Sequence, residues 1–323
     1  MPSHLLPFVS LLLHTAVALQ VQNPPTTTAP PSASPQKRGE ASSFIVAGYL
    51  PDYQLDRWSG PADSLTDLIY FGLTLSNDGR FEPTALSKKH AKLLKEKKTA
   101  AGHRLLFALG GWNKSAGFAK LTADARLREQ FIEAAKTFCL EHGFDGIDYD
   151  WEHPQGEQEI KSYALLLQET HKAFAPHKLI VTVALASWQD LGQDAYAAVD
   201  RVHLMSYDHD FPQATLEKST ADVERLLKAG CPANKIVLGI PFYGRNQEGQ
   251  AQSYAKLTKV EAVKNGTDIV NGFAINGPAT VAAKVQLARE KKLAGIMIWE
   301  LAQDGPGDQS LLRTIRNELK AHR

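Results

Sequence analysis

Short apolar runs recur along residues 43–301, and a longer segment of mixed polar and apolar positions follows most of them. The runs are rich in Val, Ile, Leu and aromatic residues, as expected of parallel strands that are buried on both faces. The predicted strands span residues 43–50, 67–75, 104–111, 144–152, 179–186, 201–208, 235–244 and 293–301.

The segments between the runs have apolar residues at helical spacing. In residues 122–143 these are Leu127, Phe131, Ala135 and Phe138, and Gly143 can end the helix. Alternating strands and helices predict a (β/α)8 TIM barrel of the α/β class, in a single domain. A doubly wound open sheet is the alternative, because counting strands does not show closure. The connection between the fifth and sixth runs has only about a dozen residues, near the lower limit for a parallel crossover.

The first forty residues differ in kind from the rest. Residues 5–19 are apolar but short for a membrane span, and Ala16-Val17-Ala18 has the small-x-small pattern of a cleavage site. We therefore expect a signal peptide over 1–19, although residues 1–6 contain no Lys or Arg. Residues 20–40, rich in Pro, Thr and Ser, predict a disordered linker before a domain over 41–323. The expected location is extracellular, without membrane insertion of the mature chain.

Composition limits the classes of partner and cofactor that the chain is expected to bind. The chain is 43% hydrophobic and 22% charged with a net charge of +1, which is typical of a globular protein. It has no basic run, so we expect no nucleic-acid partner. The histidines lack ligand spacing, so no metal or other cofactor is predicted. The two cysteines, Cys139 and Cys231, lie in different helix–strand connections and are expected to be free thiols.

Four carboxylates crowd into the fourth predicted strand, "FDGIDYDWE". Because side chains alternate between the faces of a strand, Asp148, Asp150 and Glu152 share one face with Gly146, and Asp145 lies on the other. In a barrel, Asp148, Asp150 and Glu152 would line the interior toward the C-terminal end of the strand, where catalytic residues of this fold lie. A solvated edge strand and a site for a hard cation are the alternatives. The apolar neighbours favour burial, and two-residue spacing gives a column rather than a cage.

This column has a chemical logic. Two close carboxylates do not both ionise easily, so Asp148 and Asp150 can share a proton. Glu152, beside an acid and an aromatic wall, is expected to have a raised pKa and to act as a general acid.

The "DGIDYDWE" segment resembles the DxxDxDxE signature of family 18 glycoside hydrolases, the chitinase family. Further segments resemble the family's strands in the expected order, from about Ser43 to Arg313. They are "AGYLPDY", "FALGGW", "MSYD", "GIPFYGR" and "GIMIWEL". The chain resembles a bacterial-type catalytic domain of this family without the chitinase insertion lobe, because residues 246–292 are too few for a sizeable lobe and its helix.

The resemblance implies substrate-assisted retaining catalysis, in which the substrate's own N-acetyl group is the nucleophile. Glu152 would be the general acid and base, Asp150 would orient the acetamido group, Asp148 would tune Asp150, and Tyr207 would bond the acetamido oxygen. The implied sugar contacts are Trp299, Asp208, Met205, Tyr49, Trp112 and Arg245. Without the motif, Trp299 could equally be a core aromatic, and Arg245 could equally form a structural ion pair. Asp145 is expected to be structural, and Gly146 to leave space beside the column.

The chain departs from the family pattern at three places. Its second strand reads "YFGL", so either Phe71 or Gly72 takes the place of the family's phenylalanine. Ala108 stands where the family has serine, which removes a hydroxyl near the aspartates and could move the pH optimum. The short segment between the last two strands predicts a shallower and more open cleft.

Three functions remain open on the sequence. The first is a secreted chitinase that cleaves β-1,4-linked N-acetylglucosamine polymers, acting as a monomer on a glycan partner. The second is an endo-β-N-acetylglucosaminidase that acts on glycoprotein glycans or peptidoglycan, which an open cleft would admit. The third is a chitin-binding lectin on the same barrel, which the intact Glu152 disfavours.

Overall fold

Eight parallel strands form a closed barrel in the computed structural model, which describes residues 44–60, 64–260, 263 and 266–321. Neighbouring strands follow the order β1-β12-β7-β6-β5-β4-β3-β2. Closure confirms the predicted (β/α)8 barrel and excludes the open sheet. The predicted signal peptide and linker lie outside the described residues. The barrel strands are β1 (Ile45–Pro51), β2 (Asp67–Leu73), β3 (Arg104–Gly110), β4 (Gly146–Asp150), β5 (Ile180–Ala186), β6 (Arg201–Met205), β7 (Ile236–Pro241) and β12 (Gly295–Trp299).

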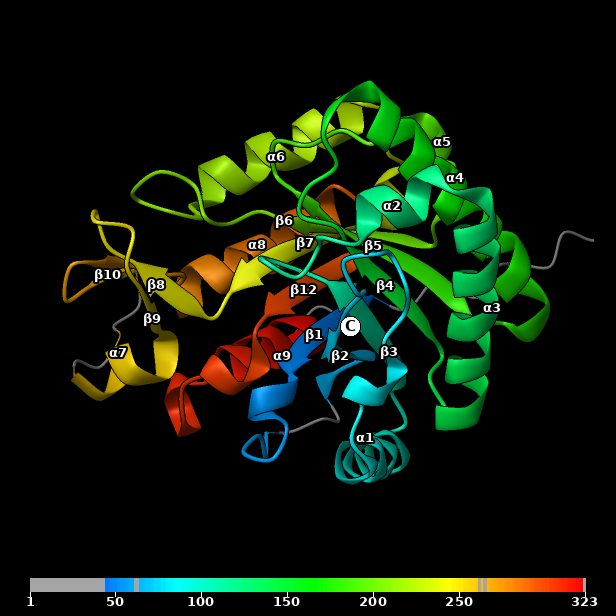
Figure 1. The fold of residues 1–323 in the computed structure, drawn as a ribbon. Coiled ribbons are helices and arrows are strands. Elements are labelled where there is room, and N and C mark those ends of the chain that lie inside the picture. The colour runs from blue at the N-terminus through cyan, green and yellow to red at the C-terminus, as the bar shows by residue number, and fades with distance from the viewer. Residues whose placement is uncertain (1–43, 61–63, 261–262, 264–265, 322–323) are drawn as a thin grey trace, which may run out of the picture. The chain divides into compact units, whose positions relative to one another are not determined.

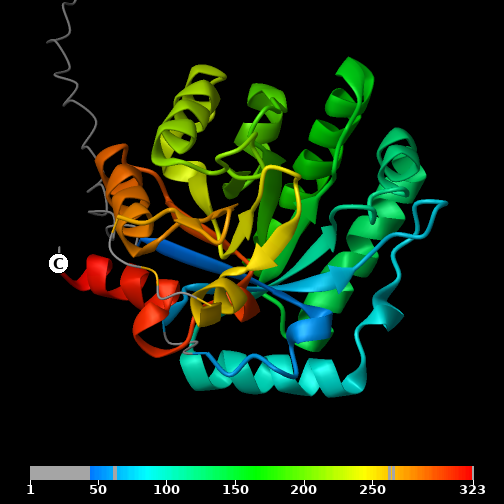
Figure 2. The same ribbon diagram turned by 90° about the vertical axis from the view of Figure 1, so that its left-hand side faces the viewer.

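Helices surround the barrel (Figures 1 and 2). On α3, Phe131, Ala135 and Phe138 are buried, and Gly143 ends the helix in the left-handed conformation, both as predicted. The crossover between β5 and β6 is short, and its one helix, α5, has only seven residues. The helices are α1 (Lys88–Ala101), α2 (Phe118–Ala123), α3 (Ala125–His142), α4 (Gly156–Phe174), α5 (Gly192–Ala198), α6 (Leu216–Lys228), α7 (Tyr254–Val260), α8 (Pro278–Glu290) and α9 (Leu311–Ala321). Short 3-10 turns are η1 (Asp52–Gln54), η3 (Pro83–Ala85), η4 (Ala175–His177), η5 (Ala233–Lys235), η6 (Leu301–Gln303) and η7 (Gly307–Gln309).

The connection between β7 and β12 differs from the sequence prediction. The predicted strand over 235–244 is two strands, because β7 ends at Pro241, where it pairs with Trp299, and Tyr243 then pairs antiparallel with Ser253. The chain then enters a second sheet, ordered β10-β11-β8-β9, which Figure 1 shows beside α7. Its antiparallel strands are β8 (Tyr243–Arg245), β9 (Ala251–Ser253), β10 (Ile269–Val270) and β11 (Phe273–Ala274). The shallower cleft that we expect from the length of this connection stays a prediction.

The apolar core has two parts. The larger packs the outer faces of the strands against the helices and contains Phe107, Ile147 and Tyr149. The smaller lies among the inward side chains and continues to the residues just past the strand ends, such as Tyr207 and Tyr243. Its inward members are mainly apolar, so the buried acids of β4 stand in an environment that favours their neutral forms.

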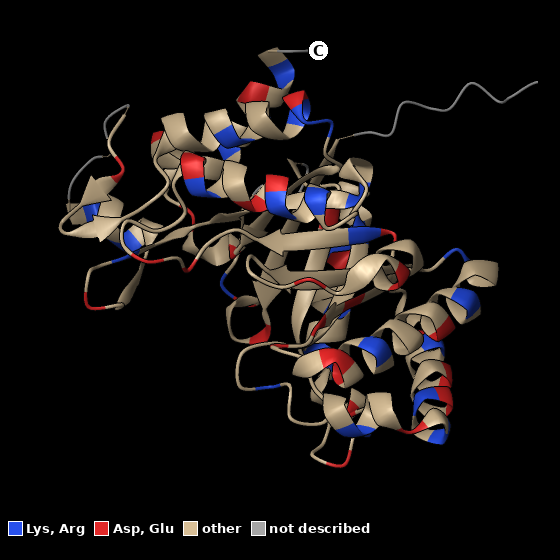
Figure 3. Cartoon of the chain, turned by 90° about the horizontal axis from the view of Figure 1, so that it is seen from above, with Lys and Arg blue, Asp and Glu red and all other residues tan. Residues whose placement is uncertain are grey.

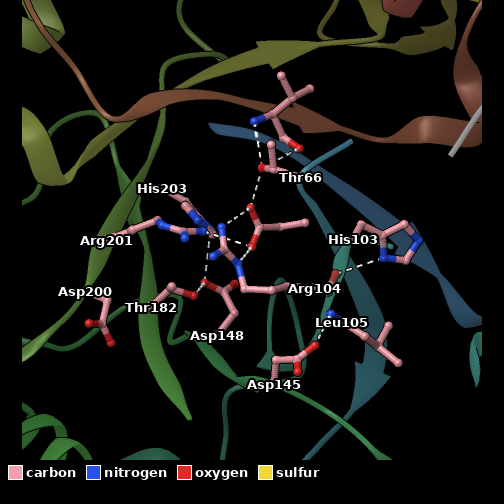
Figure 4. A network of polar contacts seen from close by, with 12 residues as sticks. Thr66, His103, Arg104, Leu105, Asp145, Asp148, Thr182, Asp200, Arg201 and His203 are labelled. Atoms are coloured by element: carbon pink, nitrogen blue, oxygen red, sulfur yellow. Dashed lines mark hydrogen bonds and ion pairs between the residues drawn. The ribbon is translucent and has the colours of Figure 1, made fainter. Parts of the chain in front are cut away.

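An ion-pair network occupies the N-terminal end of the barrel (Figure 4). Asp67 is fully buried at the start of β2, and its Oδ1 lies 2.6 Å from Arg104 Nε and 3.0 Å from Arg201 Nη1. Burial alone would raise the pKa of Asp67, but bonding to Arg104 and the Arg201 charge outweigh it, so the pKa is lowered. Asp145 also stabilises this end, because its Oδ2 accepts the Leu105 N–H at 2.8 Å.

Charges on the outer surface are mixed. Figure 3 shows blue and red segments interspersed along the helices that surround the barrel. In the part of the chain that the structure describes, no helix is long and apolar enough to cross a membrane. Cys139 and Cys231 are buried free thiols, as predicted, and burial raises the pKa of both.

Lys284 on α8 is a buried lysine that makes the stability of the fold depend on pH. Its side chain is fully buried, its Nζ has no hydrogen-bond partner among the described residues, and burial lowers its pKa to about 7. The unfolded chain has an ordinary lysine pKa near 10.5, so between about pH 7 and 10 it binds more protons than the folded chain, and stability rises with pH.

We expect Lys284→Met to raise the free energy of unfolding at pH 6 by a few kcal/mol, because it removes the penalty of a buried, unpaired charge. The gain should shrink as the pH approaches 10, because the folded lysine is then neutral and the free-energy cost of its lost proton falls as the pH nears the pKa of the unfolded lysine. Urea unfolding at both pH values measures this, with exposed Lys256→Met as the control. An equal gain at both pH values would contradict the prediction.

Candidate active site

Three acids of β4 line one path from the barrel interior to its mouth. Asp148 and Asp150 are buried, and the Glu152 side chain, two residues beyond the strand, is 15% exposed. Tyr149 points outward, where its hydroxyl lies 2.7 Å from Thr170 on α4. The alternation predicted from the sequence is therefore present. A Cβ at Gly146 would lie 2.1 Å from the Ile180 carbonyl oxygen, so its close neighbour is the backbone of β5 rather than the acids.

Polar side chains from three other strands hold Asp148. Tyr49 on β1 donates to its Oδ2 at 2.6 Å, and Thr182 on β5 donates to its Oδ1 at 2.5 Å. His203 on β6 places Nδ1 3.1 Å from Oδ1 and 3.0 Å from the Tyr49 hydroxyl. Figure 4 shows Thr182 and His203 turned toward Asp148. These contacts fix the carboxylate of the lowest acid in the column.

Tyr49 corrects one sequence expectation. We expected it in the wall of a sugar subsite, but it is 1% exposed and bonded to Asp148. Sequence reasoning also missed Thr182 and His203. Both are polar residues within the apolar runs of β5 and β6, and that mismatch could have identified them.

Asp150 is the least satisfied acid in the column. Its Oδ1 is buried without a hydrogen-bond partner among the described residues. Burial raises its pKa well above the ordinary value, and the charges of Glu152 and Asp148 raise it further. Gly111 lies beside it, and a Cβ there would meet the Phe71 ring at 2.4 Å and Asp150 Oδ2 at 3.4 Å. Ala108 is buried opposite Asp148 in the register of β3 with β4.

Glu152 has the electrostatics of a general acid. Burial and then the charge of Asp208 raise its pKa to about 7, although a bond from the Trp112 backbone opposes the rise. The Glu152 N–H donates to the Ser115 hydroxyl at 3.0 Å. Its carboxyl therefore keeps a proton up to neutral pH, which is the range in which a general acid transfers it most effectively.

A mainly apolar and aromatic wall faces the acids. Trp299 at the end of β12 meets Phe71 edge to face, with ring centroids 4.9 Å apart, and Tyr49 at 5.6 Å. Phe71 thus faces the interior, and a Cβ at Gly72 would meet Asp52, which settles which of the two takes the inward place. Buried Tyr207 donates to Met297 Sδ at 3.8 Å.

Met205 packs partly buried against the interior cluster that contains Tyr207. Asp208 lies at the rim, and its Oδ1 is 2.5 Å from both Arg245 Nε and the Tyr243 hydroxyl. Arg245 thus forms an ion pair with Asp208, and its contact with sugar hydroxyls stays a prediction. Sequence reasoning missed Tyr243, which the break after β7 turns toward this site.

Exposed aromatic residues follow several strands at the mouth end. Trp112 after β3 is 70% exposed and was expected in a subsite wall. Trp188 after β5 and Tyr53 after β1 are 64% and 62% exposed and were not predicted. Their common feature is an aromatic residue within three residues of a strand's C-terminal end. In the described part of the chain, no cluster of His, Cys, Asp and Glu could hold a metal ion.

A (β/α)8 barrel whose strand ends hold a protonated carboxyl group beside further acids and aromatic rings has the design of a glycoside hydrolase. Residues 45–304 match the family model described as glycosyl hydrolases family 18. The chain belongs to this family and is a glycoside hydrolase.

Known proteins agree with this assignment. The chain is 26% identical to "Chitinase 1" of Aphanocladium album, in an alignment that covers 98% of this chain and 94% of the relative. The crystal structure of a chitinase from Bacteroides thetaiotaomicron has a TM-score of 0.79 at 22% identity, covering 87% of this chain and 98% of that one. A family 18 chitinase from Cycas revoluta, solved in complex with (GlcNAc)4, has a TM-score of 0.73 at 24% identity over 85% and 99% of the chains. Both structures share the fold.

We expect the carboxyl carbon of Glu152 to titrate near pH 7 in a 13C NMR titration, with Glu152→Gln used to assign the resonance. Asp208→Asn should lower this pKa, because it removes a negative charge that opposes ionisation of Glu152. The pKa should still exceed that of an ordinary glutamate, since burial remains. Exposed Asp308→Asn is the control. An unchanged Glu152 pKa in Asp208→Asn would show that the Asp208 charge does not act there.

Proposed function

We propose that the chain is a chitinase that hydrolyses β-1,4-linked N-acetylglucosamine polymers. The observation that carries the proposal is the column of Asp148, Asp150 and Glu152, whose outermost member keeps a proton near neutral pH. Family membership and the nearly full-length likeness to a named chitinase support the same substrate class.

In the first step, the sugar's N-acetyl oxygen attacks the anomeric carbon while the glycosidic bond breaks. Glu152 gives its proton to the departing oxygen, and the sugar becomes a cyclic oxazolinium ion. No enzyme nucleophile is needed, so the other acids are free to position the acetamido group. Asp150 has an unpartnered Oδ1 that can accept the acetamido N–H and so orient the acetamido group.

In the second step, Glu152 is a carboxylate and takes a proton from water, which attacks the anomeric carbon from the opposite side to the acetamido oxygen. The oxazolinium ring opens and the product keeps the β configuration. Asp148 supports both steps through Asp150, because its own position is fixed by donors from three strands.

The remaining site residues bind the sugar. Tyr207 supplies a rigid donor to the acetamido oxygen, and Met205 lines the acetyl pocket. Trp299 stacks on the pyranose ring at the floor of the site. Asp208 accepts a sugar hydroxyl while Arg245 and Tyr243 hold it in place, and Trp112 offers an exposed ring for a neighbouring sugar.

Wild type should release β-anomeric chitobiose from chitin oligosaccharides, as read by NMR in the first minutes. Glu152→Gln should lose roughly 10²–10⁴-fold in kcat, because the amide cannot donate a proton to the leaving oxygen. Exposed Glu217→Gln is a matched control that should keep full activity. Early α-anomeric product would overturn the retaining mechanism.

A high-mannose glycopeptide and peptidoglycan, assayed in parallel, separate the alternatives. Cleavage of either substrate but not of chitin oligosaccharides would replace chitinase by an endo-β-N-acetylglucosaminidase. Binding to chitin with no cleavage of any substrate would favour a lectin.

We also propose that the enzyme is exported, that residues 1–19 are removed and that it acts as a monomer. The apolar stretch before Ala16-Val17-Ala18 and the linker composition support export. Expression of the full chain in a secreting host should release the protein into the culture medium. Its N-terminus, determined by mass spectrometry, should lie close to Gln20. Retention in the cell with an intact N-terminus would contradict this proposal.

A further inference from the structure

His153 follows the general acid directly and is held on two sides. Its Nδ1 lies 3.1 Å from the side-chain oxygen of Gln189, and its ring meets the Trp188 ring edge to face, with centroids 5.0 Å apart. Its Nε2 faces Glu152 and lies 3.6 Å from Oε2. The side chains of His153 and Glu152 are 16% and 15% exposed, so little water competes at this contact.

Gln189 determines which ring nitrogen holds the proton. The Gln189 side-chain oxygen also accepts the Ala186 N–H, at 3.4 Å. A backbone N–H cannot donate to an amide NH2 group, so the oxygen of Gln189 is the atom that faces His153. Nδ1 of His153 must then donate to it, and in the neutral ring Nε2 is left with a lone pair.

The imidazole is neutral when the acid needs its proton. Burial lowers the pKa of His153 below the ordinary histidine value, against the opposing effect of the Gln189 bond. Glu152 keeps its proton to about pH 7. A carboxyl O–H and an imidazole lone pair therefore face each other near neutral pH. Their 3.6 Å separation exceeds a hydrogen bond by roughly half an ångström, and such contacts often shorten when substrate binds.

We propose that His153 is a positioning residue for the general acid: its Nε2 accepts the O–H of Glu152, which holds the acid form and its orientation and so sets the alkaline limit of activity. No covalent step is involved, because the proton stays on Glu152 until the glycosidic oxygen takes it. The kinetic part of this inference rests on the proposed function, whereas the proton placement does not.

Other charged groups around the pair must be considered with it. The negative charge of Asp208, in the loop after β6, opposes ionisation of Glu152, and it is present whether or not His153 is. Within the site, the titratable groups near the pair are Asp148, Asp150, Tyr207 and Asp208. Three charged groups on neighbouring segments have partners of their own. Glu159 accepts the Gln155 N–H, Asp190 accepts from the Tyr196 hydroxyl, and Arg225 donates to the Gln189 carbonyl.

The test compares His153→Phe, which keeps a ring against Trp188 but has no acceptor, with His153→Gln, whose amide oxygen can reach the place of Nε2. Loss of one bond to the acid form should lower the Glu152 pKa, measured by 13C NMR, by about half to one pH unit in His153→Phe. His153→Gln should recover part of the shift. Exposed His177→Phe, in η4, is the matched control and should match wild type.

The pH dependence of kcat/KM on chitin oligosaccharides should change in the same direction. Because Glu152 loses its proton at lower pH in His153→Phe, the alkaline limb should move to lower pH by the same amount, while the maximal rate changes less. A purely structural role of His153 would reduce activity at all pH values and leave the limb in place, which would overturn the inference.

A 15N NMR spectrum of wild type tests the proton placement without any variant. The expected result is a proton on Nδ1 and an unprotonated Nε2 at neutral pH, and the reverse tautomer would overturn the inference. If chitin is not cleaved, the proposed function fails, but the two NMR measurements still decide the role of His153. If chitin is cleaved and the Glu152 pKa is equal in wild type and His153→Phe, the inference alone fails.

Discussion

The structure depends on how three carboxyl groups are tolerated inside an otherwise mainly apolar barrel. Burying an ionised carboxylate costs several kcal/mol unless donors replace its water. For Asp148 the donors come from β1, β5 and β6. The carboxylate therefore gains its hydrogen-bond partners only when these strands have assembled into the barrel. A mispaired strand would leave that acid unsatisfied as well as misplace it. The site is therefore fixed by the fold rather than added to its surface.

The two ends of the barrel treat buried charge in opposite ways. At the N-terminal end, Asp67 accepts hydrogen bonds from Arg104 and is ion-paired with Arg201, and its pKa is lowered. At the C-terminal end, Asp150 has a partnerless oxygen and Glu152 no lysine or arginine partner in the described structure, and both pKa values are raised. Satisfied groups stabilise the fold, while unsatisfied groups remain available to a substrate. The same residue type thus serves stability at one end and chemistry at the other.

Strand alternation made the acid column predictable from the sequence. Because side chains alternate between the two faces of a strand, Asp148, Asp150 and Glu152 all point inward if one of them does. The eight strands were equally visible as apolar runs. Contacts between strands were not, because they depend on register around the barrel. This is why the partners Thr182 and His203 were missed and why Tyr49 was placed in a subsite wall. The turn out of the barrel after Pro241 was missed because residues 235–244 have one continuous apolar pattern, and only the antiparallel pairing of Tyr243 with Ser253 shows that the chain has left the barrel.

In the proposed reaction Glu152 is an acid in one half and a base in the other, so neither form can be stabilised too strongly. Burial and Asp208 favour the acid, whereas the Trp112 N–H favours the carboxylate. The influences of Asp208 and Trp112 come from two separate loops, after β6 and after β3, which substrate would contact. A bound sugar chain would exclude water from Glu152 and strengthen the acid form before bond cleavage, and departure of the leaving sugar would admit water and favour the base. In the proposed mechanism, the alternation of roles would thus follow from which parts of the site the sugar covers.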